Sequence, residues 1–173
     1  MRPIIRQFDG TKYDFLSNFY PSCIYYNNMK YQNAEAAFQG QKPADLRERE
    51  FYQNLLPNEA KSYGRRCKLR KDWENIKDQI MYEVVTAKFS QNYHLKQLLI
   101  ATNNAELVEG TKWNDRYWGI DLYSGQGLNH LGQILEKVRE DLGGWKRDYI
   151  EEEWLQCLNK KKLIDSYDTI KFT

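Results

Sequence analysis

The strongest constraint on the fold is a run of apolar residues with helical spacing in the last third of the sequence. Apolar residues recur every three or four positions, at Leu128, Leu131, Leu135, Val138 and Leu142, and the pair Gly143-Gly144 follows. Residues at these intervals share one face of a helix, and glycine is favoured just past a helix end. The pattern predicts an amphipathic helix that packs on a core, and a chain of 173 residues is long enough to build one.

Two further helices are expected upstream of it. The longest runs from Trp73 to about Asn92, with Asp72 as its cap, because its apolar positions have helical spacing: Ile76, Ile80, Val84 and Val85. A shorter helix carries Leu95, Leu98 and Leu99. Beyond Gly144, apolar residues at Ile150, Trp154 and Leu158 fit one more helix. We therefore expect a domain over residues 1–144 and a helical extension over residues 145–173 that packs on it.

The first third of the chain combines short strands with one helix. Asn33 is expected to cap a helix from Ala34 to about Lys42, where Pro43 discourages continuation. Strands are expected at Pro3–Phe8, in a hairpin over Cys23–Tyr31 that turns at Asn27-Asn28, and at Ala105–Glu109. The predicted fold class is α+β: a mostly helical single domain with a few short N-terminal and central strands.

Composition narrows the class of protein. The formal charge of +2 argues against a dedicated nucleic-acid coat or a polybasic membrane anchor, but it leaves room for a local phosphate pocket. No apolar run approaches the ~18 residues of a membrane helix, and no signal peptide is recognised at the start. Three widely spaced cysteines suggest no disulfide framework. We expect a cytoplasmic protein without membrane attachment, whose oligomeric state the sequence does not indicate.

Two polar clusters in the first third are candidates for chemistry. Ser17 and Asn18 precede Pro21 between large rings, a pattern that favours a turn over a loop that offers Asn18 to a ligand. Glu35 and Lys42 are seven residues apart, so on one helix both would lie on the same face and could cooperate in proton transfer and nucleophilic attack. The alternative is that the two charges merely complement the helix dipole, which would also raise the pKa of Lys42.

Two more candidates follow later in the chain. Lys88 continues an apolar stripe, and it is either a lysine that extends its amine to solvent at a helix end or a cation that faces a buried anionic ligand. The segment from Asp115 to Gly119 and the glycines before the last helix, Gly125 and Gly127, could bring backbone N–H groups close to a phosphate or a carbonyl. A plain loop explains that second pattern equally well.

Several short motifs occur in a characteristic order. They are Asn18-Phe19-Tyr20-Pro21, Ala34-Glu35 with Phe38-Gln39 and Lys42, Met81 with Lys88-Phe89, Leu107-Val108-Glu109, Asp115 with Tyr117-Trp118-Gly119, and Gly127-Leu128-Asn129-x-Leu131-Gly132-x-Ile134-Leu135 with Arg139. In this combination the chain resembles the NADAR family, which includes the YbiA-like proteins, from about Phe8 to Leu142. Two positions depart from the family pattern: Ala36, where many relatives have His, and Asp121, where Gly often stands.

The resemblance implies N-glycosidase activity on ribose-linked bases, without a metal or an organic cofactor. Carried over by motif, the implied active-site residues are Glu35, Lys42, Asp115 and Trp118, and the implied lining residues are Asn18, Trp73, Gly119 and Asn129. Lys88 is retained as a candidate substrate-binding residue. Family activities include release of ADP-ribose from modified guanine in DNA or RNA, which we take as the expected function, and hydrolysis of early riboflavin-pathway intermediates.

Two chemical routes and two other classes of function remain open. In one route Lys42 attacks C1 of the ribose and forms a Schiff base; in the other, Glu35 or Asp115 positions a water molecule. We favour the lysine route, with Trp118 stacking on the base or walling off solvent. The same pocket could instead bind ADP-ribose or an NAD-like ligand without turnover. A structural protein that uses its tyrosine-rich surface to bind partners ranks last.

Overall fold

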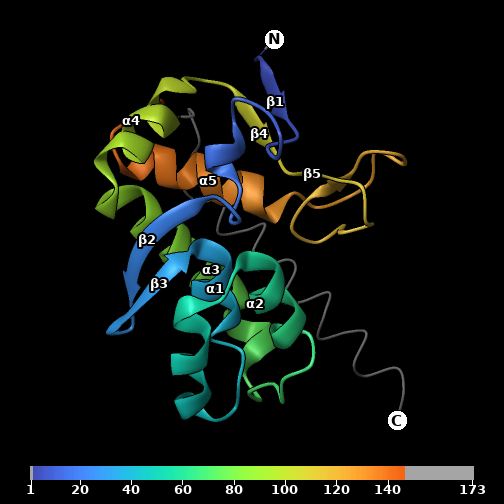
Figure 1. Ribbon diagram of the computed structural model, residues 1–173. Helices are drawn as coiled ribbons and strands as arrows, with labels where there is room; N and C mark the ends of the chain where they lie inside the picture. The colour runs from blue at the N-terminus through green and yellow to red at the C-terminus, as the bar shows by residue number, and fades with distance from the viewer. Residues whose placement is uncertain (1, 147–173) are drawn as a thin grey trace.

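The computed structural model describes residues 2–146, and its elements are shown in Figure 1. The chain begins with strand β1 (Ile4–Arg6), which pairs in parallel with β4 (Glu106–Val108), so that Ile5 lies opposite Leu107. Both strands lie within the segments expected from the sequence. The helical extension predicted after Gly144 falls outside the described residues, except for Trp145 and Lys146.

The predicted hairpin is confirmed. Strand β2 (Pro21–Tyr26) and strand β3 (Met29–Asn33) pair antiparallel, and the turn between them consists of Asn27 and Asn28. Both asparagines have positive φ angles, 49° and 61°, as a two-residue hairpin turn requires. The hairpin leads directly into the next helix, so it fixes the position at which that helix starts.

Five α-helices and two 3₁₀ helices are found within residues 2–146. They are 3₁₀ helices η1 (Asp14–Leu16) and η2 (Leu46–Asn54), and α-helices α1 (Ala34–Gln39), α2 (Pro57–Gly64), α3 (Trp73–Gln91), α4 (Tyr93–Ala101) and α5 (His130–Asp141). Helix α3 contacts α1, α4, α5 and β2, and Figure 1 shows it running through the middle of the molecule. The structure is therefore the single α+β domain that the sequence predicts. Within the described residues no helix is both long and apolar enough to span a membrane.

The core lies where α3 and α5 pack together. Val84, Val85 and Phe89 of α3 and Leu135 and Val138 of α5 are all completely buried. Each such side chain contributes about 1.5–3 kcal/mol by leaving water, so this contact is a main source of stability. One part of the prediction for α5 is wrong: the helix begins at His130, and Leu128 precedes it and is 49% exposed.

Two details at other helix ends differ from the prediction, although α3 begins at Trp73 as expected. Helix α1 is capped by Asn33, whose side chain accepts a hydrogen bond from the N–H of Ala36 as expected, but it ends at Gln39 rather than near Lys42. Asp72 precedes α3 without capping it through its side chain, because its carboxylate pairs with Arg70 at 2.6 Å instead.

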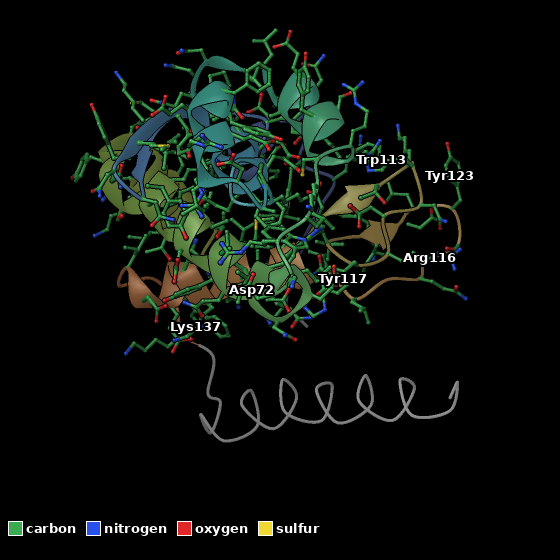
Figure 2. The ribbon with its side chains drawn as sticks, turned by 90° about the horizontal axis from the view of Figure 1, so that it is seen from below. Asp72, Trp113, Arg116, Tyr117, Tyr123 and Lys137 are labelled. Atoms are coloured by element: carbon green, nitrogen blue, oxygen red, sulfur yellow. The ribbon has the colours of Figure 1, made fainter. Side chains whose placement is uncertain are left out.

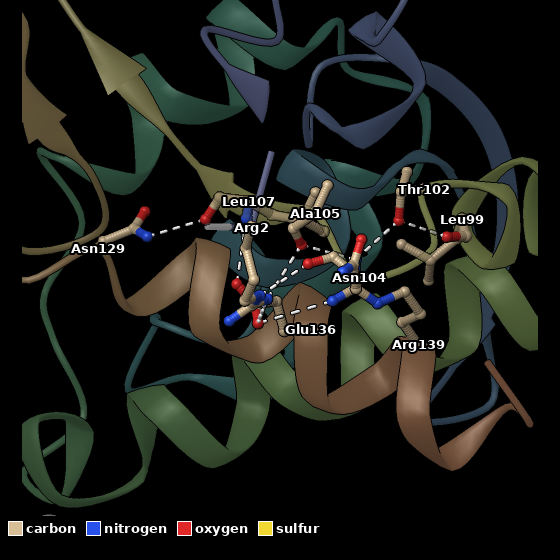
Figure 3. A network of polar contacts seen from close by, with 9 residues as sticks. All are labelled: Arg2, Leu99, Thr102, Asn104, Ala105, Leu107, Asn129, Glu136 and Arg139. Carbon is tan, nitrogen blue, oxygen red and sulfur yellow. Dashed lines mark hydrogen bonds and ion pairs between the residues drawn. The ribbon is translucent and has the colours of Figure 1, made fainter. Parts of the chain in front are cut away.

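A polar network joins α5 to β4 (Figure 3). The Arg139 guanidinium is buried and donates to Thr102 Oγ1 at 2.8 Å and to the Ala105 carbonyl at 2.9 Å. Glu136 accepts from the N–H of Leu107 at 3.1 Å and pairs with Arg2 at 2.6 Å. These contacts hold the strand beside the helix and so fix the point where the chain leaves β4.

The last pair of strands is short. Strand β5 (Gly110–Thr111) pairs in parallel with β6 (Ile120–Asp121), and residues 112–119 form the loop between them. We call residues 112–119 the wall loop, because it forms one side of the pocket described next. Figure 2 shows Trp113, Arg116 and Tyr117 of this loop on the same side of the molecule as Tyr123, which follows β6.

Candidate functional site

One pocket of about 210 Å³ lies between α1, α2, the turn before β2 and the wall loop. Charged and aromatic side chains dominate its lining. The carboxylates are Asp9, Glu35, Glu109 and Asp115; the cations are Lys42, Lys61 and Arg65; and the rings are Phe19, Phe38, Trp113 and Trp118. Ser17, Asn18, Gln39, Met81 and Leu131 complete it. A pocket with this lining can hold an anionic ligand that carries a flat ring.

Four residues that were predicted to form the active site all line this pocket: Glu35, Lys42, Asp115 and Trp118. They come from helix α1, from the segment that follows it and from the wall loop. Their separation along the chain shows that the fold, rather than one motif, brings them together.

Glu35 lies in the first turn of α1 and is only 6% exposed. One of its oxygens accepts a hydrogen bond from Gln39 Nε2 at 2.8 Å. Burial raises the pKa of Glu35, while Lys61 and the Gln39 hydrogen bond act in the opposite direction. A carboxyl group with a raised pKa can hold and pass on a proton near neutral pH.

Lys42 reaches the pocket by a route different from the predicted one. Because α1 ends at Gln39, Lys42 is not on the helix, and the argument that it shares a helical face with Glu35 is wrong. Its amine lies over the rings of Phe38 and Trp73, at 5.7 and 5.5 Å from their centroids. Burial lowers the pKa of Lys42, and Glu35 partly opposes this. The amine also lies beyond the last helical turn, where the helix dipole would favour its charge.

Asp115 and Trp118 are held by the local structure of the wall loop. Asp115 Oδ1 accepts from the N–H of Tyr117 at 3.2 Å and of Trp118 at 3.0 Å. The Tyr117 hydroxyl donates to Asp78 of α3 at 2.6 Å, which ties the loop to that helix. The Trp118 ring meets Phe38 edge-on, with centroids 5.4 Å apart. This position is consistent with the expected role of Trp118 in shielding the pocket from solvent.

Asn18 also lines the pocket, and its side chain is 6% exposed. Its Nδ2 contacts Met81 Sδ at 3.2 Å, whereas Oδ1 is buried and has no partner among the described residues. A buried acceptor without a donor costs about 1–3 kcal/mol, so a ligand hydroxyl or N–H would relieve this cost. The turn predicted here is present too, because Ser17 Oγ accepts from the N–H of Phe19 at 3.2 Å.

The other four predicted residues do not line the pocket. Trp73 lies behind it, with its ring against Phe38 at 5.2 Å. Asn129 donates to the Leu107 carbonyl at 2.9 Å and accepts from the N–H of Glu109 at 3.0 Å. Gly119 packs so close to Glu109 that a Cβ there would lie 2.3 Å from the Glu109 carbonyl oxygen. Asn129 and Gly119 therefore position Glu109, which does line the pocket.

Lys88 is the fourth, and the interpretation that it extends its amine to solvent at a helix end is wrong. It is completely buried, so its amine does not extend to solvent, and Nζ donates to the Ser17 carbonyl at 2.6 Å. Burial lowers the pKa of Lys88 to about 7. The amine supports the turn that presents Asn18, instead of facing the pocket itself.

Seven charged or aromatic pocket residues were not predicted as site residues from the sequence: Asp9, Phe19, Phe38, Lys61, Arg65, Glu109 and Trp113. Two signals could have found some of them. Residues 61–71 contain six basic residues and no acidic ones, and Glu109 ends a motif that the resemblance includes. Burial raises the pKa of Glu109 to about 8, and Asp9 adds to this, so its carboxyl is mostly neutral at pH 7. No group of three or more metal-ligating side chains is found within residues 2–146.

The sequence profile of the NADAR domain matches residues 6–143, which is most of the chain and includes every pocket residue. This chain belongs to the NADAR domain family. The match begins and ends close to the limits expected from the motifs, and it covers the elements from β1 to α5.

Individual relatives agree with this assignment. The chain is 41% identical over 147 residues to the N-glycosidase YbiA of Escherichia coli, covering 82% of this chain and 91% of that protein. The solved NMR structure of E. coli YbiA matches with a TM-score of 0.73 and 38% identity, over 82% of this chain and 86% of that one. A riboflavin biosynthesis protein of Vibrio vulnificus is 31% identical over 176 residues, which cover 98% of this chain but 46% of that protein.

Proposed function

We propose that this protein is an N-glycosidase that hydrolyses the bond between a base and a ribose in a nucleotide-like substrate. The observation that carries the proposal is the meeting of Glu35, Lys42, Asp115 and Trp118 in one pocket. Acid, amine and aromatic groups together meet the needs of glycosidic cleavage, which requires help for the leaving base and for C1. The relatives named N-glycosidase support the same reaction.

Lys42 is the proposed nucleophile. Its lowered pKa increases the fraction of neutral amine, the form that attacks C1 of the ribose. As the N–C1 bond to Lys42 forms, the bond from C1 to the base breaks, and the base leaves with the electron pair and takes up a proton. Lys42 loses a proton, the ring C1–O4 bond opens with protonation of O4, and a protonated imine remains. Water adds to C1 and releases the free amine and the ribosyl product.

The pocket carboxyls serve this sequence in different ways. Glu35, with its raised pKa, gives a proton to the departing base and takes one from the water that hydrolyses the imine. Asp115 holds ribose hydroxyls, and the unpartnered Asn18 Oδ1 accepts from another hydroxyl. In the alternative route Glu35 or Asp115 directs a water molecule at C1 without a covalent intermediate.

The proposed substrate is ADP-ribose attached to guanine in DNA or RNA. Residues 61–71, which we call the basic segment, begin with the pocket residue Lys61 and hold six cations. Within residues 2–146 only Arg70 among them forms an ion pair, with Asp72. Unneutralised cations beside a pocket favour binding of a phosphate backbone. The net charge of +2 for the whole chain does not reveal this local excess of positive charge.

An early intermediate of riboflavin biosynthesis is the second candidate substrate. It is favoured by the similarity to the V. vulnificus riboflavin biosynthesis protein, of which this chain spans less than half. A free nucleotide of this kind needs the pocket alone, so it would make no use of the basic segment beyond Lys61 and Arg65.

A product assay by mass spectrometry decides between these substrates. The protein is incubated separately with DNA that carries ADP-ribosyl-guanine, with riboflavin intermediates and with NAD. The proposal expects free ADP-ribose and restored guanine from the first. Release of base from the riboflavin intermediate alone would move the assignment to the second candidate, and no product from any of the three would refute glycosidase activity on these substrates.

Borohydride separates the two chemical routes. Reduction during turnover should convert the imine into a stable adduct on Lys42, found by peptide mass spectrometry. Lys42→Arg keeps the charge but cannot form an imine, so the adduct should vanish; Lys61→Arg, in the same pocket, should retain it. Turnover without an adduct would favour the activated-water route.

Glu35→Gln separates an enzyme from a binding protein that does not turn its ligand over. The enzyme should lose on the order of 10²-fold or more in kcat, because the glutamine cannot transfer a proton. A protein that only binds should keep its affinity and show no turnover either before or after the substitution.

A further inference from the structure

The amine of Lys61 lies over two aromatic rings at the pocket. Nζ is 5.4 Å from the centroid of the Phe19 ring and 5.3 Å from that of Trp113, over the face of each. The three side chains come from the turn before β2, from α2 and from the wall loop. We call the space between the two ring faces the ring gap.

We propose that the ring gap is a stacking site for the flat base of the substrate, with Phe19 on one side and Trp113 on the other. This inference rests on the proposed function, because it assigns the end of the pocket that receives the base. It names Trp113 and Phe19, rather than Trp118, as the residues that recognise that base.

Each of the two rings leaves room over its face for a base. Stacked rings approach to about 3.5–4 Å, which is less than the distance that the Lys61 amine keeps from each ring centroid. Trp113 is 52% exposed and belongs to the wall loop, so its indole can adjust its position to close on a ligand. Such a large exposed ring at a pocket is an ordinary feature of proteins that stack on bases.

Trp118 is less suited to the role. Its ring already contacts Phe38, Tyr117 and His130, with centroids 5.4, 4.9 and 6.3 Å away. Trp113 contacts no other aromatic ring within residues 2–146, and the amine of Lys61 lies over its face. A ligand base can therefore stack on the face of the Trp113 ring, whereas the Trp118 ring is already packed against other rings.

Entry of a base would displace Lys61 from the ring gap. A cation over an exposed ring is weakly held, and Arg65, a second cation that lines the pocket, marks the side where substrate phosphates would attract the amine. Lys61 also lowers the pKa of both Glu35 and Glu109. Its departure would let both pKa values rise, which favours the protonated form of each carboxyl when a base is present to receive a proton.

Two probes test the inference without requiring turnover. GMP carries a base, and ribose 5-phosphate lacks one; the Kd of each is measured by calorimetry. Trp113→Ala should weaken GMP binding about tenfold or more, the usual effect of losing one stacking contact, and leave ribose 5-phosphate binding within about twofold. Trp113→Phe should retain most of the affinity for GMP, and Phe19→Leu should behave like Trp113→Ala.

The matched control is Tyr123→Ala. Tyr123 is 81% exposed on the same side of the molecule, yet it does not line the pocket (Figure 2). It should change neither Kd. The inference is overturned if the wild type binds GMP no more tightly than ribose 5-phosphate. It is overturned equally if Trp113→Ala weakens both probes alike or neither, or if Tyr123→Ala reproduces its effect.

The outcomes distinguish this inference from the proposed function. If the protein releases base from none of the candidate substrates but loses GMP affinity in Trp113→Ala, the stacking site stands and the glycosidase proposal fails. If base is released and GMP binding does not depend on Trp113, the glycosidase proposal stands and the stacking site is refuted.

Discussion

Asn129→Ala should destabilise the protein by about 3–7 kcal/mol. The substitution removes two hydrogen bonds and leaves the Leu107 carbonyl and the Glu109 N–H without these partners, at about 1–3 kcal/mol each. Asn129 also has a φ of 53°, in the left-handed region, where alanine costs about 1 kcal/mol more than asparagine or glycine. The change in the free energy of unfolding is measured by urea denaturation followed by circular dichroism.

Two further measurements show where the effect originates. Asn129→Gly loses the same hydrogen bonds but adopts the left-handed conformation easily, so it should be about 1 kcal/mol more stable than Asn129→Ala. Steady-state kinetics are recorded at a temperature where both variants are folded, and kcat should fall because Glu109 is displaced. If Asn129→Ala unfolds within about 1 kcal/mol of the wild type while KM rises, Asn129 contacts the substrate directly and its positioning role is refuted.

Three other substitutions test the buried groups around the pocket. The wild type should lose at most about 5 kcal/mol of stability between pH 4.5 and about 8, because the folded state raises the pKa of Glu109 to about 8 and binds its proton more tightly than the unfolded state does. Glu109→Gln should lack this loss. Identical pH profiles of unfolding free energy for variant and wild type would contradict this. The wild type should gain at most about 5 kcal/mol of stability between about pH 7 and 10.5, because the pKa of Lys88 is lowered to about 7 in the folded state and the unfolded state keeps the proton to higher pH. Lys88→Met should lack this gain. The same denaturation series checks it, and an unchanged slope of unfolding free energy against pH would count against a buried amine. Gly64→Ala places a Cβ 1.8 Å from Gln39 Oε1, so Gln39 must move and release Glu35. The basic limb of the pH–rate profile, where Glu35 loses the proton that it gives to the base, should then shift to higher pH. Ser62→Ala on the exposed side of α2 should leave this limb in place, and a profile unaltered by Gly64→Ala would show that Gln39 does not tune Glu35.

The parts of the fold that follow local rules could be predicted from the sequence. The hairpin turn at Asn27-Asn28, the cap at Asn33 and the apolar spacing of α3 each depend on neighbouring residues, and the structure has all three. Boundaries were less predictable. Asn129 adopts a left-handed conformation just before α5, so the helix cannot extend back to Leu128, although Leu128 has the helical spacing in the sequence.

The part of the site that lies in the ordered sequence motifs was predictable. Glu35, Lys42, Asp115 and Trp118 were placed together by resemblance, although the helical argument for Lys42 was wrong because α1 is shorter than predicted. Lys61 begins a run of basic residues that is visible in the sequence, but its place at the pocket depends on α2 packing against α1, a contact that carries no sequence pattern.

Within residues 2–146 the strands form three separate two-stranded pairs rather than one continuous sheet. A long ladder transmits an insertion or a register slip to every strand that follows, whereas an isolated pair confines it. The wall loop leaves and re-enters the fold at the β5–β6 pair, beside the Asn129 and Gly119 contacts that hold Glu109. Exchange of residues 112–114 between relatives should therefore alter which bases are accepted while the rest of the molecule keeps its shape.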